Sequence, residues 1–491
     1  AVLDSEGEPN LEQWQKAEEL LALNEGDHEI TKFQIRAHTP RTSKIRFVSP
    51  KIPAFGWQTL WVRQMDERET DTPKEIPLFL KPLLPLAMKV AQTSLGEKVL
   101  GSLGRWQGDK PPYVIENEYY LVEASPSDGT VTLHDKKTGA IFTGLNQFVD
   151  GGDAGDTYNY SPLEKDTFVT PTVKGVDVFL DRVNPSMTVH YSMKLPAALS
   201  ADRKTRSKQF IEMPIQSRLS LLPGVQRVDI RTTVENQAKD HRLRVHFPAS
   251  FGRPEAHYDG HFEVVRRPVG VPEKGKEWVE TPRPEVPQRA FTDVSNGEVG
   301  LMIANRGLPE VAVLDRVNGK GDEIALTLLR CVGWLSRGDL PVRQGHAGPA
   351  LETPDAQMPG KWTFEYAILP HKGDWQEVCR EAYAYQTRLR AIETSLHTGG
   401  LPKEGAFLTH SPKDFEVSAI KPAEQGEGWI VRGVNLTDEI LQVWIKPLAP
   451  FSSAHRVNLA EDVEAKLDSL ADGGVQFKVK GYQIASILFR P

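Results

Sequence analysis

Near the start of the chain, apolar residues recur with the period of an α-helix. Those of Leu11–Leu23 fall on one face, with Glu and Lys between them, which predicts an amphipathic helix. From Phe33 onward apolar and polar residues alternate instead, as in strands with one buried face. Residues 64–112 break the alternation, being charged at first and then helical, so we expect a helical insertion there.

From Tyr113 to about Pro370 the alternating pattern predicts β-structure throughout. Short strands follow one another at regular spacing, separated by Gly, Pro and Asp turns, as in large antiparallel sheets that pack face to face. The segment 226–236 is one such strand, and it places four residues on a single face: Val228, Ile230, Thr232 and Val234.

The rest of the chain predicts one helix and a second set of strands. Trp375–Thr394 has helical spacing, and Gly399–Pro402 is predicted as a linker before further short strands. We therefore predict a mainly β chain in three parts. These are leading strands with the helical insertion at about 64–112 (1–112), a large antiparallel β-sandwich (113–400) and a small C-terminal β-sandwich (401–491).

Composition excludes several classes of protein. The 491 residues carry a net charge of −7 without long runs of one sign, which gives no footprint for nucleic acid or an anionic membrane. The most apolar run, Ile76–Ala91, contains three prolines and two lysines and is too short to span a bilayer. Cys331 and Cys379 are predicted to be free, buried thiols, as in a reducing, cytoplasmic location.

The most distinctive stretch is Gln147–Pro162, QFVDGGDAGDTYNYSP, with three Asp, three Gly and two Tyr. Such a content of Gly and Asp predicts a turn and not the interior of a strand. Carboxylates beside exposed aromatic rings suit a sugar. The carboxylates can accept hydrogen bonds from pairs of sugar hydroxyls, and the rings can cover the apolar C–H face of the sugar. The other interpretation is a solvated loop whose Asp side chains bond to their own backbone.

Searches for other motifs give one further candidate. The sequence has no P-loop, dinucleotide fingerprint, nucleophile elbow or paired Cys-x-x-Cys. In His257-Tyr-Asp259-Gly-His261, alternation in a strand would put three zinc-ligand types on one face. However, Asp259-Gly260 is a common turn pair, so we expect a turn or a subunit contact and no metal ligands here.

Several stretches taken together resemble the C-terminal, β-rich half of the glycoside hydrolase family 38 α-mannosidases, in their bacterial branch. The resemblance runs from about Phe33 to the end. The stretches that carry it come in family order: Pro53–Leu60, Ile115–Tyr120, Asp135–Gly139, Gly155–Pro162, Phe291–Ser295, Ala304–Glu310, Leu329–Arg337, Gly345–Pro349, Phe364–His371, Ser418–Lys421 and Ile430–Asp438.

The resemblance implies a supersandwich of the galactose mutarotase-like type and cleavage of α-mannosides with retention. In this family two carboxylates do the chemistry and a zinc ion contacts the sugar hydroxyls. All of these groups lie in an N-terminal barrel and the helical domain after it. Because AVLDSEGEPN lacks a Met and the barrel motifs are missing, we expect this chain to begin inside a larger protein. Alone, it is expected to be inactive.

By resemblance the chain therefore supplies a wall of the active site, with no catalytic residue and no metal ligand of its own. Tyr158 resembles a family tyrosine that reaches the sugar, and Arg330 resembles an arginine that points into the same cleft. Asp156 and Asn159 are added as substrate-binding candidates because of their place in the loop. The expected partners are an α-mannoside and the chain's own N-terminal catalytic half, and a homo-oligomer is left open.

Two other functions remain open at this point. One is a non-catalytic carbohydrate-binding or scaffold module, and the other is a mutarotase-like epimerase with a His and Glu pair in a concave sheet. The mannoside itself, whether mannosylglycerate or an α-linked oligosaccharide, is also left open.

Overall fold

The structure is a computed structural model. It describes residues 49, 52–61, 112–180, 184–315, 322–394 and 398–491. The predicted helix at 11–23, the alternating segments at 33–48 and the insertion at 64–112, apart from its last residue, lie outside these described residues.

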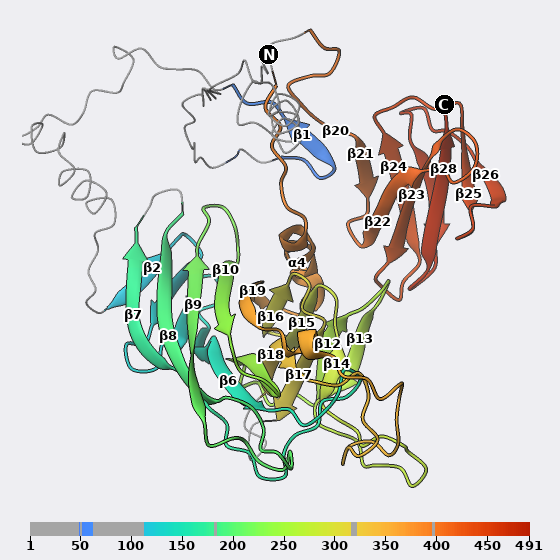
Figure 1. Cartoon of the computed structure of the whole chain (residues 1–491). Coiled ribbons are helices and arrows are strands. Elements are labelled where there is room, and N and C mark those ends of the chain that lie inside the picture. The colour runs from blue at the N-terminus through green and yellow to red at the C-terminus, as the bar shows by residue number, and fades with distance from the viewer. Residues whose placement is uncertain (1–48, 50–51, 62–111, 181–183, 316–321, 395–397) are drawn as a thin grey trace, which may run out of the picture. The chain divides into compact units, whose positions relative to one another are not determined.

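One layer of the large sandwich is an antiparallel sheet of nine strands (Figure 1). In spatial order they are β13 (Val264–Pro268), β12 (Glu255–Asp259), β15 (Phe291–Ser295), β16 (Val299–Asn305), β19 (Gly360–Lys372), β10 (Val228–Asn236), β9 (Phe210–Ser220), β8 (Ser186–Pro196) and β7 (Thr172–Phe179). The predicted face of β10 is confirmed, because Val228, Ile230, Thr232 and Val234 are all buried.

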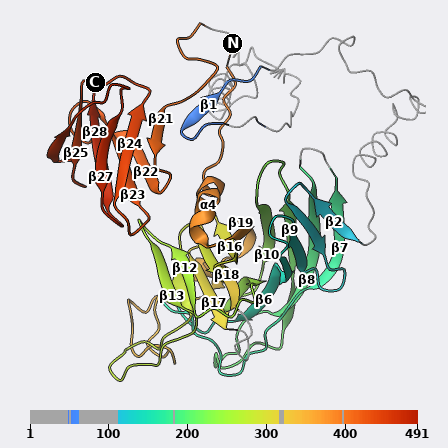
Figure 2. The same ribbon diagram turned by 180° about the vertical axis from the view of Figure 1, so that it is seen from behind.

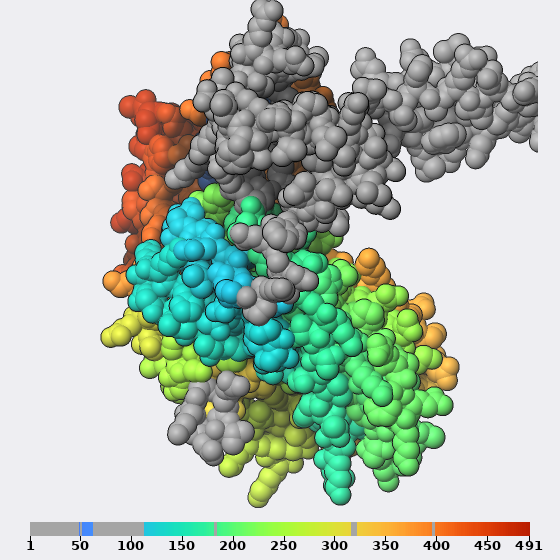
Figure 3. Space-filling view, turned by 90° about the vertical axis from the view of Figure 1, so that its left-hand side faces the viewer, coloured from blue at the N-terminus to red at the C-terminus, as the bar shows by residue number. Residues whose placement is uncertain are grey.

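The second layer consists of two further antiparallel sheets. The five-stranded sheet has the order β14 (Glu285–Pro287), β17 (Glu310–Asp315), β18 (Asp322–Cys331), β11 (His241–Pro248) and β6 (Gln147–Gly152). The four-stranded sheet is β2 (Tyr113–Glu116), β3 (Tyr120–Ala124), β4 (Val131–Asp135) and β5 (Ile141–Leu145). In the space-filling view these last strands, in blue to cyan, lie beside β7 and β8 (Figure 3).

Alternation on β11 decides which face of the five-stranded sheet is the core. Leu243, Val245 and Phe247 are fully buried and join the same apolar cluster as Val228 and Ile230 of the opposite layer. The intervening residues of β11 are polar and lie on the other face. Arginine and histidine side chains are therefore placed on the other face of this sheet. Figure 2 shows three strands of the sheet, β6, β17 and β18, from behind.

The turn predicted over Gln147–Pro162 is wrong for its first part, which is the strand β6. Gly151 pairs with Arg242 of β11 across the ladder. A Cβ at Gly151 would lie 2.8 Å from the ring of Phe168, closer than atoms can pack. This glycine is therefore explained by the close approach of a ring and not by a turn. The irregular backbone begins only at Asp153.

The predicted helix over Trp375–Thr394 is shorter in the structure. A 3₁₀ turn (η3, Trp375–Glu377) leads into α4 (Cys379–Gln386), and the described residues that follow directly, 387–394, are not helical. The Nε of Arg306 donates to the carbonyl of Tyr385 at 2.7 Å, so a side chain takes an acceptor of the last turn.

The small sandwich consists of two antiparallel sheets around its own apolar core. One is β21 (Leu408–Ser411), β24 (Leu441–Pro447) and β27 (Val475–Val479). The other is β22 (Phe415–Pro422), β23 (Trp429–Asn435), β28 (Ile484–Arg490), β25 (Ser453–Val457) and β26 (Val463–Leu467). Its core includes Phe415, Val443 and Phe489. A separate pair joins β1 (Gly56–Gln58) to β20 (Glu404–Ala406).

The predicted class, mainly β with antiparallel sandwiches, is confirmed by these sheets. The domain boundaries, 1–112, 113–400 and 401–491, stay predictions. Both cysteines are free and buried, as expected. Within the described residues, no helix is long and apolar enough to cross a lipid bilayer.

A buried polar chain crosses the core between the two layers. The Tyr366 hydroxyl donates to Oδ1 of Asn146 at 2.8 Å and lies 2.7 Å from the Thr232 hydroxyl. The Asn146 amide donates to Ser217, which lies 3.1 Å from Thr232. All four side chains are buried, so each hydrogen bond replaces one that water would otherwise supply.

We expect Tyr366→Phe to lower the free energy of unfolding of the large sandwich by about 1–3 kcal/mol, because it leaves two buried polar groups short of a partner. Urea denaturation followed by tryptophan fluorescence measures this. Tyr482→Phe is the matched control, because that ring is 59% exposed and its change should be close to zero. Equal midpoints for the two variants would contradict the assigned role.

Candidate functional site

The loop Asp153–Pro162, which follows β6, is held by carboxylates that point inward. The Asp153 carboxylate is fully buried and accepts from the N–H groups of Gly155 at 2.9 Å and Ser161 at 3.2 Å. Arg330 of β18 donates to its other oxygen, at 2.9 and 2.8 Å. Glycine is required at 155, since a Cβ there would collide with the carbonyl of Asn159.

Asp156 is the second anchor. Its Oδ2 accepts from Arg343 at 2.6 Å and from the Arg337 N–H at 2.8 Å. Its Oδ1 accepts from the N–H groups of Tyr158 and Asn159 at 3.0 and 2.9 Å. Burial alone would raise the pKa of this carboxyl, but the bonds from Arg343, Arg337 and Asn159 lower it below its ordinary value. The side chain is an ionised, fully buried anchor of the loop.

Tyr158 is the side chain that these anchors present to solvent. Its ring is 53% exposed, and its hydroxyl has no hydrogen-bond partner among the described residues. The ring lies against Gly348, where an added Cβ would come within 2.7 Å of the hydroxyl oxygen. The guanidinium of Arg343 lies 6.0 Å from the ring centroid. The Tyr158 side chain is half-exposed and has a free hydroxyl, and its backbone is held by the two carboxylate anchors. It can therefore bind a polar ligand.

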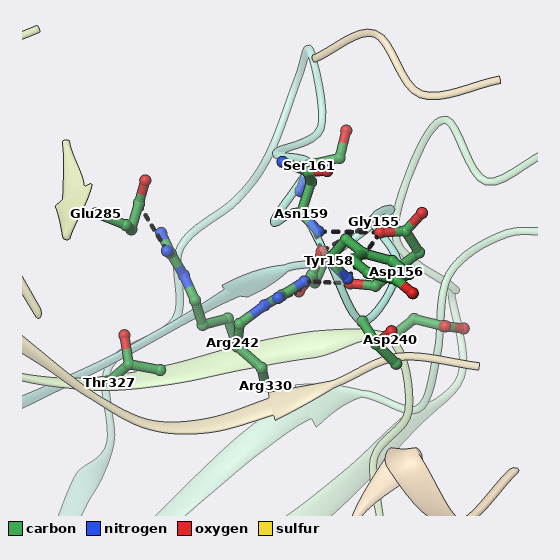
Figure 4. Close-up of polar contacts among 12 residues, drawn as sticks. Gly155, Asp156, Tyr158, Asn159, Ser161, Asp240, Arg242, Glu285, Thr327 and Arg330 are labelled. Carbon is green, nitrogen blue, oxygen red and sulfur yellow. Dashed lines mark hydrogen bonds and ion pairs between the residues drawn. The ribbon is translucent and has the colours of Figure 1, made fainter. Parts of the chain in front are cut away.

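The four predicted substrate-binding residues lie together around this loop (Figure 4). Their surroundings differ. Arg330 is bonded to Asp153 and to the carbonyl of Asp156, and the Asn159 amide spans Glu280 and Arg343. In this structure Asp156, Asn159 and Arg330 therefore position the loop, whereas the Tyr158 side chain is presented to solvent. Direct contact of any of them with substrate stays a prediction.

A stacked pair covers the next part of the sheet face. The Arg242 guanidinium lies 3.4 Å from the centroid of the Tyr160 ring and donates to Glu285 at 2.6 Å. Arg244, two residues along β11, lies on the same face. Burial, together with the positive charge of Arg242, lowers the pKa of Arg244 to about 10. The positive charges that border the loop are matched by carboxylates, since Glu285 and Glu310 both lie near this pair of arginines.

The third carboxylate, Asp150, lies inside β6 and forms a buried charge network. It is ion-paired with Arg206 and accepts from Nδ1 of His241 at 2.5 Å. The other ring nitrogen of His241 lies 3.1 Å from Oδ1 of Asn236. Burial disfavours the charged imidazole, but the charge of Asp150 outweighs it and raises the pKa of His241 to about 10.

Sequence reasoning missed Arg343, the buried partner of Asp156, because no local pattern marks it. It lies between stretches of the resemblance, 187 residues from Asp156. One signal was available for the carboxylates. Asp150, Asp153 and Asp156 are spaced by three, and all three prove to be buried anchors.

The structure does not bring the His257–His261 segment together as a metal site. β12 ends at Asp259, so the alternation required for a shared face stops before His261. Asp259 instead accepts from the Tyr383 hydroxyl at 2.8 Å and is ion-paired with Arg289. Across the residues that the structure describes, no three His, Cys, Asp or Glu side chains are grouped so that they could hold a metal ion.

Comparison with protein families gives two matches that follow the two sandwiches. Residues 115–355 match the glycosyl hydrolases family 38 C-terminal domain, and residues 414–487 match the family 38 C-terminal beta sandwich domain. Together these segments cover more than half of the chain. The chain belongs to glycosyl hydrolase family 38. The family expected from sequence is thus confirmed.

Relatives place the chain among distant members of the family. It is 28% identical over 408 residues to a putative mannosylglycerate hydrolase of Halalkalibacterium halodurans, covering 78% of this chain and 42% of the relative. It is 27% identical over 256 residues to mouse alpha-mannosidase 2C1, covering 50% of this chain and 21% of that one. The chain thus spans less than half of the length of these relatives.

A solved structure agrees with this comparison. An α-mannosidase from Enterococcus faecalis superposes with a TM-score of 0.65 at 27% identity, over 78% of this chain and 43% of that one.

We expect Asp156→Asn to lower the free energy of unfolding by about 3–5 kcal/mol, because Arg343, only 3% exposed, would keep a buried charge without its partner. Denaturation measures the loss, and amide hydrogen exchange of residues 155–161 should become faster. Asp339→Asn is the control, since Asp339 pairs with Arg337 while 66% exposed and should cost about 0–1 kcal/mol. Similar losses for both variants would refute the anchoring role.

The pKa of His241 predicts a pH dependence of stability. Its value is raised from an ordinary value near 6.5 to about 10 in the folded state, so the protonated ring stabilises the fold fully below about pH 6.5. That contribution falls as the pH rises through about 10. We expect the free energy of unfolding of the wild type to fall over this interval more steeply than that of His241→Gln. Parallel pH profiles would contradict the assignment.

Proposed function

We propose that this chain is the C-terminal, β-rich part of a retaining α-mannosidase and forms a wall of its active site. The observation that carries the proposal is the loop Asp153–Pro162. Two buried carboxylate–arginine pairs fix it, and it presents Tyr158 with a free hydroxyl in a family 38 framework. The Tyr158 hydroxyl would bond to a sugar hydroxyl, and the exposed ring would cover an apolar face of the sugar.

The reacting carboxylates are proposed to lie outside this chain, in the N-terminal barrel of the complete enzyme. A retaining glycosidase needs one carboxylate free to attack and another to donate a proton. Asp150 of β6 and Asp153 and Asp156 of the loop are each fully buried and paired with a cation, so none is available for either step. We also assign the zinc ion to the barrel, because the described residues offer no ligand group for it.

The names of the matched relatives support the proposed class of substrate. The matched proteins are a putative mannosylglycerate hydrolase and α-mannosidases, so we propose an α-mannoside. The partner would be the N-terminal catalytic half, with self-association left as a second proposal. We further propose a cytoplasmic location, on the strength of two free, buried thiols.

A non-catalytic carbohydrate-binding module is the second candidate. The observation in its favour is the same one, since a fixed loop with an exposed tyrosine binds sugars whether or not a barrel completes the site. Turnover separates the two. We expect the chain alone to leave an aryl α-mannoside intact and to support hydrolysis, with zinc, when combined with its N-terminal half. Mannose binding with no turnover in the complete protein would favour the module.

We expect Tyr158→Phe in the complete enzyme to lower kcat/KM by about 1–3 kcal/mol of transition-state stabilisation, the scale of one hydrogen bond to a polar substrate. Steady-state hydrolysis of an aryl α-mannoside measures this. Tyr482→Phe, on the exposed surface of the small sandwich, serves as the control and should leave the kinetics unchanged. Unchanged kinetics in both variants would remove Tyr158 from the site.

A further inference from the structure

A second concave site lies in the large sandwich, away from the loop Asp153–Pro162. It is a cleft of about 600 Å³, within the range of about 300–1,000 Å³ that small-molecule sites occupy. Its walls come from the β2–β3 and β4–β5 turns, the turn before β10, the end of β19, and η3 with the start of α4. None of its lining residues belongs to the candidate site described above.

The cleft is lined by a tyrosine whose hydroxyl can bond to a ligand. Tyr120 lines it and is only 2% exposed, yet within the part of the chain that the structure describes its hydroxyl makes no hydrogen bond. Burial, and then the charges of Asp135 and Glu381, raise the pKa of this phenol, so it stays protonated and able to donate. A hydroxyl that lines a cleft can donate one hydrogen bond and accept others, from a ligand or from water.

The charges around this hydroxyl are balanced. Three cationic side chains and three carboxylates line the cleft: Lys137, Lys372 and Arg380, and Asp135, Glu377 and Glu381. A charged ligand would be attracted by half of these groups and repelled by the other half, so the lining favours neither sign of net charge. A neutral ligand rich in hydroxyls can accept hydrogen bonds from the cations and donate to the carboxylates. Tyr119, also in the lining, adds an aromatic ring.

We propose that this cleft is a second carbohydrate-binding site, specific for neutral oligosaccharides, with the Tyr120 hydroxyl as its central hydrogen-bonding group. It lies on the same sandwich as the loop that we assign to the active site, but it requires neither the barrel nor turnover. Such a site would hold a sugar chain without reacting with it.

The test is binding of α-mannobiose to the full 491-residue chain, by saturation-transfer NMR and calorimetry. We expect Tyr120→Phe, which keeps the packed ring, to weaken binding by about tenfold, the loss of one hydrogen bond. Glu377→Gln changes an exposed side chain of the cleft wall, so it tests the same site without affecting the core. It should weaken binding as well.

Tyr482→Phe, at an exposed ring outside both sites, is the matched control and should leave this binding unchanged. Loss of binding in Tyr158→Phe but not in Tyr120→Phe would assign the sugar to the loop and overturn the proposal. Tighter binding of mannose 6-phosphate than of the neutral sugar would overturn the ligand class, and no saturation transfer to α-mannobiose would overturn the site. Hydrolysis by the complete enzyme is not part of this test, so the proposed function can fail or hold independently.

Discussion

The buried pairing of carboxylates with arginines is the interaction on which the candidate site depends. Between Asp153 and Pro162 the chain has few apolar side chains, so burial of apolar surface cannot hold the loop in one shape. Asp153 and Asp156 supply that constraint through Arg330 and Arg343. A buried ion pair adds little to net stability, but when each charge is fully hydrogen-bonded the pair can favour one arrangement of the chain over others. Here each carboxylate also accepts hydrogen bonds from backbone N–H groups.

The sandwich around the loop makes this arrangement possible. Its apolar core occupies one face of β11 and leaves the other face to Arg242 and Arg244. The loop that follows β6 lies along that polar face. Arginine side chains pair there with the carboxylates of the loop, and Tyr160 stacks on Arg242. The Tyr158 side chain, by contrast, is exposed and does not pack into the core of the sandwich. Rigid support for an exposed polar side chain is a common construction of a binding surface.

Sequence periodicity predicted the fold class and the buried face of β10, because alternation reflects burial directly. It failed where the cause was not local. β6 was taken for a turn because its glycines, which face the side chains of Phe168 and Leu163 at close range, carry the same signal as turn glycines. The helix after Trp375 was extended too far because Arg306, distant in sequence, bonds to its last turn. For the site, the loop and Tyr158 could be found in advance, whereas Arg343 could not, because nothing near it in sequence marks it.

The separation of the loop from its anchors has a consequence for how the protein is made. The arginine that pairs with Asp153 lies 177 residues further along the chain, and the one that pairs with Asp156 lies 187 residues further along. Closing such long loops is slow and entropically unfavourable before the sheets exist. On the ribosome, the loop leaves the exit tunnel long before β18 has been translated, so its carboxylates remain hydrated and unpaired. The region proposed to bind sugar is thus completed among the last parts of the large sandwich, and a chain truncated before Arg343 would have strands but no finished loop.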